Sequence, residues 1–180
     1  KGRKFGGGFL KPLGFSPDGR ELTFLKFIFL PERGSQVEIT GPSYTSYIVY
    51  NLVPIIASMN IRTGDVRELA WYGIDGCWTP DGRYFIYWAG INADDRTLDK
   101  IIVFDTRTGE KRILVERGAS PTVTPDGASV IYTNDRNLYR VALAGGAAER
   151  LPADGSLWNT KCSPDGRWVL CSGNSGDPAD

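Results

Sequence analysis

The sequence predicts an all-β chain made of β-propeller blades, each a sheet of four antiparallel strands. Two observations carry this prediction: a Pro-Asp-Gly turn occurs four times, and a glycine turn five residues before a leucine follows three of them. The stretches between these markers are short and rich in β-branched and aromatic residues, which is typical of strands. Sheets repeated at a period of about forty residues are typical of propeller blades.

The first marker is the turn between the first two strands of each blade, which we call strands a and b. Asp-Gly between two apolar runs favours a hairpin, because both residues tolerate the positive φ of tight turns. Proline sets φ before the turn, and aspartate caps backbone N–H groups. We therefore predict a structural role for the four turns: Pro17-Asp18-Gly19, Pro80-Asp81-Gly82, Pro125-Asp126-Gly127 and Pro164-Asp165-Gly166.

The second marker is the turn between strands c and d, at Arg62-Thr63-Gly64-Asp65, Arg107-Thr108-Gly109-Glu110 and Ala144-Gly145-Gly146. The steps between turn prolines are 63, 45 and 39 residues, but those from a c–d glycine to the next turn proline are 16, 16 and 18. The length therefore varies between strands b and c, as expected of a repeat with variable connectors on one rim. A β-sandwich gives no reason for both markers to repeat in phase.

These spacings divide the chain into one partial propeller spanning residues 1–180. We expect strand d of a preceding blade at 1–10, a first blade at 11–72 with a long b–c insertion at 31–54, further blades at 73–117 and 118–155, and the start of a fourth at 156–180. Because proteins avoid unpaired sheet edges, we expect these four or so blades to belong to a larger propeller or to one closed by another chain.

The Ser/Thr-Pro-Asp-Gly-Arg turn, the aromatic strand b and the Thr-Gly-Glu/Asp turn before strand d resemble the TolB-like repeat. This repeat is a relative of the WD repeat and also builds the propellers of prolyl-oligopeptidase-type peptidases. The resemblance covers nearly the whole chain, and the third repeat departs from it at Ala128 and Ala144. It implies a periplasmic or extracellular binding module, or the non-catalytic half of an enzyme.

Composition argues against several function classes. The chain has no histidine, no Gly-x-Ser-x-Gly elbow and no zinc spacing among its three cysteines, so we expect neither a catalytic site nor a metal or cofactor. The formal net charge is zero, which gives no reason to expect a nucleic-acid partner. The uncharged stretch Ile39–Ile61 contains two prolines and many β-branched residues, so we interpret it as strand and loop and expect no membrane insertion.

Binding residues are expected where the b–c and d–a connectors emerge on one face. The insertion carries Tyr44, Tyr47 and Tyr50, whose large rings suit contact with a protein partner, although a hairpin packed back with buried tyrosines is the alternative. The d–a connectors add Trp71, Tyr72, Asp75, Trp158 and Asn159. We predict a non-catalytic protein-binding or scaffolding propeller; the alternatives are the substrate-gating propeller of a larger hydrolase and a small-ligand binder. Aromatic residues on strands, including Trp78, Tyr87, Tyr132 and Trp168, are expected in the core.

Overall fold

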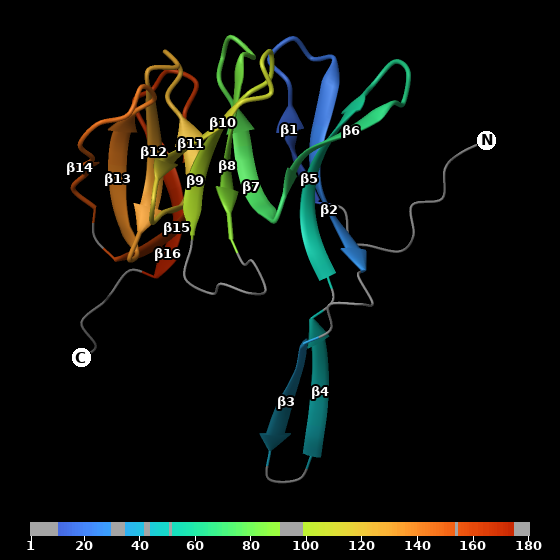
Figure 1. The fold of residues 1–180 in the computed structure, drawn as a ribbon. Coiled ribbons are helices and arrows are strands. Elements are labelled where there is room, and N and C mark those ends of the chain that lie inside the picture. Colours follow the sequence, from blue (N-terminus) through green and yellow to red (C-terminus); the bar gives the residue numbers. More distant parts are fainter. Residues whose placement is uncertain are drawn as a thin grey trace.

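The computed structural model describes residues 11–29, 35–41, 44–50, 52–90, 99–153 and 155–174. All regular elements in these ranges are β-strands, arranged as three four-stranded antiparallel sheets and two hairpins. Figure 1 shows the sheets side by side, and the described residues do not close them into a ring. The prediction of an all-β, partial propeller is confirmed, whereas the strand expected at 1–10 lies outside the described residues.

Each sheet has the blade order a-b-c-d. Blade 1 consists of β1 (Lys11–Phe15), β2 (Glu21–Phe29), β5 (Leu52–Asn60) and β6 (Val66–Trp71). Blade 2 consists of β7 (Gly73–Trp78), β8 (Tyr84–Ala89), β9 (Lys100–Asp105) and β10 (Lys111–Val115). Blade 3 consists of β11 (Ala119–Val123), β12 (Ser129–Asn134), β13 (Asn137–Ala142) and β14 (Glu149–Arg150), and β15 (Ser156–Cys162) with β16 (Val169–Asn174) forms a further a–b hairpin, called the blade 4 hairpin below.

The hydrophobic core lies between blades, because both faces of each sheet are apolar. On strand b of blade 2, Phe85 and Tyr87 pack against Ile56 and its neighbours in blade 1. The residue between them, Ile86, joins a second cluster with Tyr132 of blade 3. All four side chains are buried: Phe85, Ile56 and Ile86 are 0% exposed, and Tyr87 is 3% exposed. A strand buried on both faces reads as a continuous apolar run, which explains the sequence of β8.

The four a–b turns share one hydrogen-bonding pattern. In blade 2 the Thr79 hydroxyl donates to Asp81 Oδ1 at 2.6 Å, and the same oxygen accepts the backbone N–H of Arg83 at 3.0 Å. The Tyr84 N–H donates to Thr79 Oγ1 at 3.0 Å, which closes the base of the turn. Gly82 adopts a φ of +68°, which an L-residue with a Cβ adopts only at a cost. The turn is thus satisfied by its own residues.

Successive turns also touch one another. A Cβ placed on the turn glycine would lie 3.4 to 3.8 Å from the proline Cδ of the preceding blade's turn. The three contacts are Gly82 on Pro17, Gly127 on Pro80 and Gly166 on Pro125. The motif therefore builds a hairpin and also aligns each blade on its predecessor.

The insertion in blade 1 forms a separate hairpin of β3 (Ser35–Gly41) and β4 (Tyr44–Tyr50), paired over the full length of both strands. Figure 1 shows this hairpin beyond the blades, at the edge opposite the a–b turns. In blade 3 the same b–c connection is a two-residue turn, with φ of +45° at Asp135 and +65° at Arg136. Length variation between strands b and c is therefore accommodated outside the sheet.

The prediction that Trp168 packs in the core is wrong, since this residue is 71% exposed. It precedes β16, which pairs only with β15 in the described residues, whereas β2, β8 and β12 each have a strand on both sides. Trp78, Tyr87 and Tyr132 do lie between blades, as expected. At the equivalent position of blade 2, Tyr84 packs on the cluster shared with blade 3, and the described residues place no such following blade against Trp168.

The turn glycines provide a test of backbone strain. Gly127→Ala should lower the free energy of unfolding by about 1 to 2 kcal/mol, because Gly127 has a φ of +72° and the new Cβ would make only an ordinary contact with Pro80 at 3.5 Å. Gly127→Asn should cost less, since asparagine tolerates this conformation. Gly19, at φ +69° with open space around it, is the matched control, and Gly19→Ala should cost about as much in urea denaturation. A much smaller loss at Gly19 would show that packing, not φ, dominates.

Candidate functional site

Two connectors leave blade 1 at the same edge of its sheet. Strand β2 ends at Phe29 and β6 ends at Trp71, and both strands run away from the a–b turn in the antiparallel order. The β3–β4 hairpin and the link from β6 to β7 therefore emerge together, opposite the Pro-Asp-Gly turns (Figure 1). We call this edge of the blades the connector face.

The three candidate tyrosines lie on one strand of the insertion. Tyr44, Tyr47 and Tyr50 are in β4, where their Cα partners in β3 are Gly41, Glu38 and Ser35, respectively. The three tyrosines therefore belong to a two-stranded ribbon that projects from the blade, and not to an irregular loop.

Trp71 and Tyr72 lie at the outer side of blade 1, where strand d turns toward blade 2. The Trp71 side chain is 47% exposed, and its indole N–H donates to Glu68 Oε2 at 3.0 Å. Glu68 also accepts a 2.6 Å hydrogen bond from Lys26 Nζ, which holds the pKa of its carboxyl below the usual range. Tyr72 adopts a φ of +60°, and its backbone N–H donates to Pro54 O at 2.7 Å. Trp71 and Tyr72 therefore both make hydrogen bonds to residues of blade 1.

Asp75 and Asn159 occupy the innermost strands, five residues before the turn proline of their blades. Both lie at a β-bulge, and so does Ser120 at the same position of blade 3. Asp75 is 7% exposed and accepts the Gly76 N–H at 2.9 Å, whereas Asn159, at φ +52°, is exposed and donates to Ser172 Oγ at 3.4 Å. The neighbouring Trp158 is 40% exposed.

The predicted site residues therefore fall into three places. The tyrosines lie on the projecting hairpin, Trp71 and Tyr72 lie at the outer strand of blade 1, and the remaining three lie on inner strands of blade 2 and the blade 4 hairpin. The connector face unites the first two groups at one edge of blade 1. Asp75 and Asn159 lie on a strands, and the a strands of successive blades contact one another.

Four turn aspartates share an electrostatic feature. The side-chain hydroxyl of Ser16 is the main cause that holds the pKa of Asp18 below its usual range, followed by the Arg20 backbone N–H. In each of the other three turns, the equivalent hydroxyl and backbone N–H lower the pKa of the aspartate in the same order of effect: Asp81, Asp126 and Asp165. These carboxylates are ionised to hold the turn, so turn structure accounts for their chemistry.

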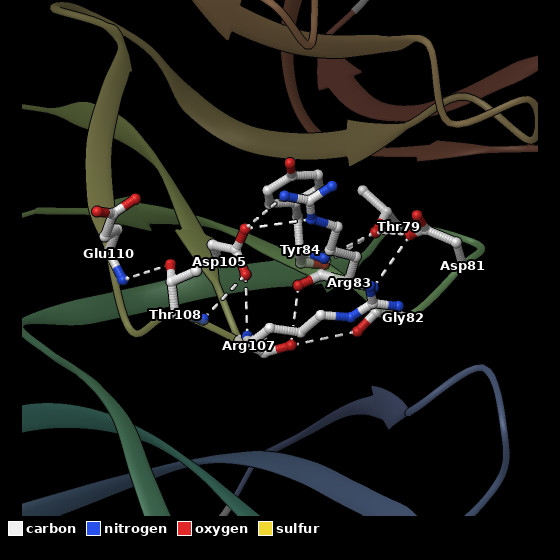
Figure 2. Close-up of polar contacts among 10 residues, drawn as sticks. Thr79, Asp81, Gly82, Arg83, Tyr84, Asp105, Arg107, Thr108 and Glu110 are labelled. Atoms are coloured by element: carbon white, nitrogen blue, oxygen red, sulfur yellow. Dashed lines mark hydrogen bonds and ion pairs between the residues drawn. The ribbon is translucent and has the colours of Figure 1, made fainter.

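A residue pair that the motif analysis did not identify links the two turns of blade 2 (Figure 2). Arg83 donates to Asp105 Oδ2 from Nε at 3.2 Å and from Nη2 at 3.1 Å, and its guanidinium lies 4.8 Å from the centre of the Tyr84 ring. Asp105 Oδ1 accepts the N–H groups of Arg107 at 2.9 Å and Thr108 at 3.3 Å. One carboxylate at the end of strand c therefore joins the a–b turn to the c–d turn.

The other blades vary this link. Strand pairing places Asn60 and Ala142 at the position of Asp105, and Arg20 and Ala128 stand at the position of Arg83. In blade 1, Arg20 lies 3.7 Å from Asp18 in its own turn, while Asn60 Oδ1 accepts two backbone N–H groups. In blade 3 both partners are alanine. The cross-turn ion pair is thus a local addition to a turn that forms without it.

Two observations concern reactive groups among the described residues. Burial raises the pKa of Cys77 to about 12, so this thiol stays protonated at neutral pH and is a poor nucleophile. No cluster of three or more potential metal ligands occurs in the part of the chain that the structure describes. In that same part, no helix has the length and apolarity needed to span a membrane.

Comparisons with known proteins bear on the fold. No family model and no curated protein sequence matches the chain. Among solved structures, TolB from Acinetobacter baumannii is similar with a TM-score of 0.69 and 20% identity, over 94% of this chain and 39% of that one. A putative TolB from Agrobacterium tumefaciens has a TM-score of 0.60 and 18% identity, over 94% and 72%. The β-propeller domain of the Trilobed protease from Pyrococcus furiosus has a TM-score of 0.59 and 11% identity, over 84% and 45%.

These likenesses and the blade order define the class of protein: the chain is part of a β-propeller. Its fold is that of the TolB-like propellers, as the repeat suggested. The chain spans 39% of the length of the first of these structures. At identities of 20% and below, the likeness extends to the fold and no further.

Acid should weaken the fold through the turns. The folded-state pKa values of the four turn aspartates lie below the ordinary 3.8, so their contribution to stability is complete above that value and is lost as the pH falls through the folded pKa values. We expect the urea midpoint to drop between about pH 5 and about pH 2. Asp126→Asn, which keeps an acceptor oxygen, should make this drop shallower; an unchanged profile would contradict the assignment.

The blade 2 link predicts an order of stabilities. Asp105→Ala should lower the melting temperature more than Arg83→Ala, because the carboxylate also accepts two backbone N–H groups that the guanidinium does not touch. The double variant, which reproduces the alanine pair of blade 3, should be more stable than the sum of the two losses predicts. Thermal denaturation of all four proteins measures this coupling, and additive losses would show that the ion pair contributes nothing.

Proposed function

We propose that the chain is a non-catalytic, protein-binding or scaffolding propeller module that acts through its connector face. The observation that carries the proposal is the β3–β4 hairpin, a projecting ribbon at the longest b–c connection of the three blades. Long connectors without a structural reason are commonly functional. The resemblance to TolB-like propellers supports a periplasmic or extracellular location for such a module.

The edges of this hairpin differ from the other sheet edges. The outer strands of the three blades carry charged residues, which discourage pairing with other chains: Arg67 and Glu68 in β6, Lys111 and Arg112 in β10, Glu149 and Arg150 in β14. The fourteen residues of β3 and β4 include a single charged residue, Glu38. Both strands pair only with each other among the described residues. A two-stranded ribbon of this kind is marginal alone and gains stability when a partner covers it.

Aromatic residues are concentrated in the sequence of this part of blade 1. Three tyrosines lie within β4, and Trp71 stands at the same edge of blade 1 with about half of its side chain exposed. Tyrosine and tryptophan dominate the binding energy of many protein interfaces. These features support a protein as the partner; a nucleic acid would require a basic surface, and the formal net charge is zero.

Replacement of the three tyrosines by alanine tests the proposal. The Tyr44→Ala/Tyr47→Ala/Tyr50→Ala variant should lose capture of the partner by at least tenfold, while its melting temperature stays close to that of the parent, because the hairpin stands outside the blades. Affinity capture from periplasmic or extracellular extract, followed by titration with the purified partner, provides the measurement.

The matched control lies on an outer strand of a different blade. Ile113 on β10 is 46% exposed and lies in the outer strand of blade 2, and Ile113→Ala should leave capture unchanged. Equal capture by the parent and the triple-tyrosine variant would contradict the proposal. Equal loss in the control would point to general instability instead of a binding site.

A second candidate function is the substrate-gating propeller of a larger hydrolase of the prolyl-oligopeptidase type. The likeness to the propeller domain of the Trilobed protease supports this candidate at the level of fold. It predicts an α/β-hydrolase nucleophile elbow elsewhere in the same polypeptide. Sequencing of the complete gene decides between the two, since the scaffolding proposal needs no such domain.

A further inference from the structure

A cavity lies between blades 1 and 2, beside their inner strands. It has a volume of about 300 Å³, and its walls come mainly from β1 and β2 of blade 1 and from β7 and β8 of blade 2. Both blades have all four strands, so the cavity is a feature of the interface between two complete sheets. Small-molecule sites have volumes of about 300 to 1,000 Å³. The cavity is therefore large enough for a small organic molecule.

The walls of this cavity are mainly apolar. Leu13 of β1 lines it on one side, and Trp78 and Phe85 line it from blade 2. The two aromatic rings pack edge to face with their centres 5.1 Å apart. The strand β1 has a register shift between Pro12 and Gly14, and a Cβ added at Gly14 would meet no other part of the protein within 4 Å. The cavity therefore accommodates an aliphatic or aromatic group.

Lys161 brings a positive charge to this cavity. It belongs to β15 of the blade 4 hairpin, whereas the other lining residues belong to blades 1 and 2. The inner strands β7, β11 and β15 contact one another in this order, so Lys161 reaches the cavity across the space that these strands border. Burial raises the pKa of the Cys77 thiol in the cavity wall to about 12, and the charge of Lys161 acts on it in the opposite direction. The ammonium group therefore lies near the wall formed by β7.

The charge of Lys161 is not neutralised by the residues around it. In the part of the chain that the structure describes, its ammonium takes part in no ion pair. Asp75 precedes the cavity wall in β7, but its carboxylate accepts the Gly76 N–H at 2.9 Å and forms no ion pair with Lys161. Lys161 can therefore pair with an anionic group of a ligand.

Thr23 adds a second hydrogen-bond donor. Its side chain lines the cavity, is 1% exposed, and accepts the indole N–H of Trp78 at 2.9 Å. Its own hydroxyl proton has no acceptor among the described residues, and a buried donor without a partner costs free energy. The Cys77 thiol, in contrast, donates to Pro121 O at 3.6 Å. Lys161 and Thr23 are both donors, so a ligand that satisfies them must carry acceptors.

We propose that this cavity binds a small monocarboxylate with an apolar body, of the arylalkanoate kind. The body lies against Leu13 and the Trp78 ring, and the carboxylate pairs with Lys161. The Thr23 hydroxyl supplies a donor for an oxygen of the ligand. Hydrogen bonds between an ammonium and a carboxylate are stronger than neutral ones, so charge determines which ligands bind. This site is separate from the β3–β4 hairpin and does not depend on the proposed function.

Titration of the whole chain with three ligands of one shape tests the proposal. The anion 3-phenylpropionate should bind saturably with a Kd of about 1 mM or below, measured by isothermal titration calorimetry. The neutral 3-phenylpropionamide should bind about tenfold more weakly or worse, because it lacks the charge-assisted hydrogen bond. The cation 3-phenylpropylamine should not bind, since Lys161 would repel its ammonium group.

Variants of two lysines locate the site. Lys161→Met keeps the length of the side chain without its charge and should weaken binding of 3-phenylpropionate by about tenfold, whereas Lys161→Arg should retain binding. Lys111→Met is the matched control, because Lys111 also lies beside aromatic rings, 5.3 Å from the centre of Phe104 and 5.9 Å from that of Tyr87, but outside the cavity. This control should bind as the parent does, and all three variants should keep the parent's melting temperature.

Three results would overturn the proposal. The first is the absence of saturable binding of 3-phenylpropionate up to about 10 mM. The second is equal affinity for the acid and its amide, which would show that the charge of Lys161 plays no part. The third is an equal loss of affinity in Lys161→Met and Lys111→Met, which would show a general effect of net charge instead of a site.

Discussion

The contact between successive blades is the constraint on which the rest of this structure depends. A single blade has apolar residues on both faces of its sheet, as Phe85 and Ile86 show by packing in opposite directions from adjacent positions of β8. Such a sheet has no stable solution in isolation, because one apolar face would remain in water whichever way it packed. Adjacent blades are joined by the contact of each later turn glycine with the preceding turn's proline, and by the hydrogen bond from the Trp78 indole to Thr23. The burial of both faces of β8 follows from that docking.

The parts that the sequence predicted are those whose cause is local. A Ser/Thr-Pro-Asp-Gly turn satisfies its own hydrogen bonds within six residues, so its presence and the two flanking strands can be inferred without knowledge of the rest of the chain. The partner of Arg83 lies 22 residues away and depends on the register of β8 on β9, which the motif does not encode. The exposure of Trp168 depends on what packs against the blade 4 hairpin, and alternation along one strand carries no information about such a neighbour.

The strand order locates the candidate residues along the blade edge but says nothing of their distance from the inner strand. The strand order indicates the edge at which each connector emerges, and on that basis Tyr44 and Trp71 belong to one face of blade 1. It does not indicate radial depth. Asp75 and Asn159 lie at register shifts of inner strands, while Trp71 lies on an outer strand. The candidate residues, which were grouped because they lie in or next to connectors, therefore fall on the hairpin, at the outer strand and on inner strands.

The two edges of the blades differ in how far their sequence and length vary from blade to blade. At the edge of the a–b turns, all four blades keep the hydroxyl, carboxylate and glycine of the turn, although blade 3 dispenses with the ion pair through Ala128 and Ala142. Any change there would alter a turn and its contact with the adjacent blade together. At the opposite edge, the b–c connection is a two-residue turn in blade 3 and a projecting hairpin in blade 1, and neither disturbs the pairing of strands b and c. New surface can therefore be added at the connector face without cost to the docking of blades, which is the physical reason to seek binding there and to regard the repeated motif as scaffold.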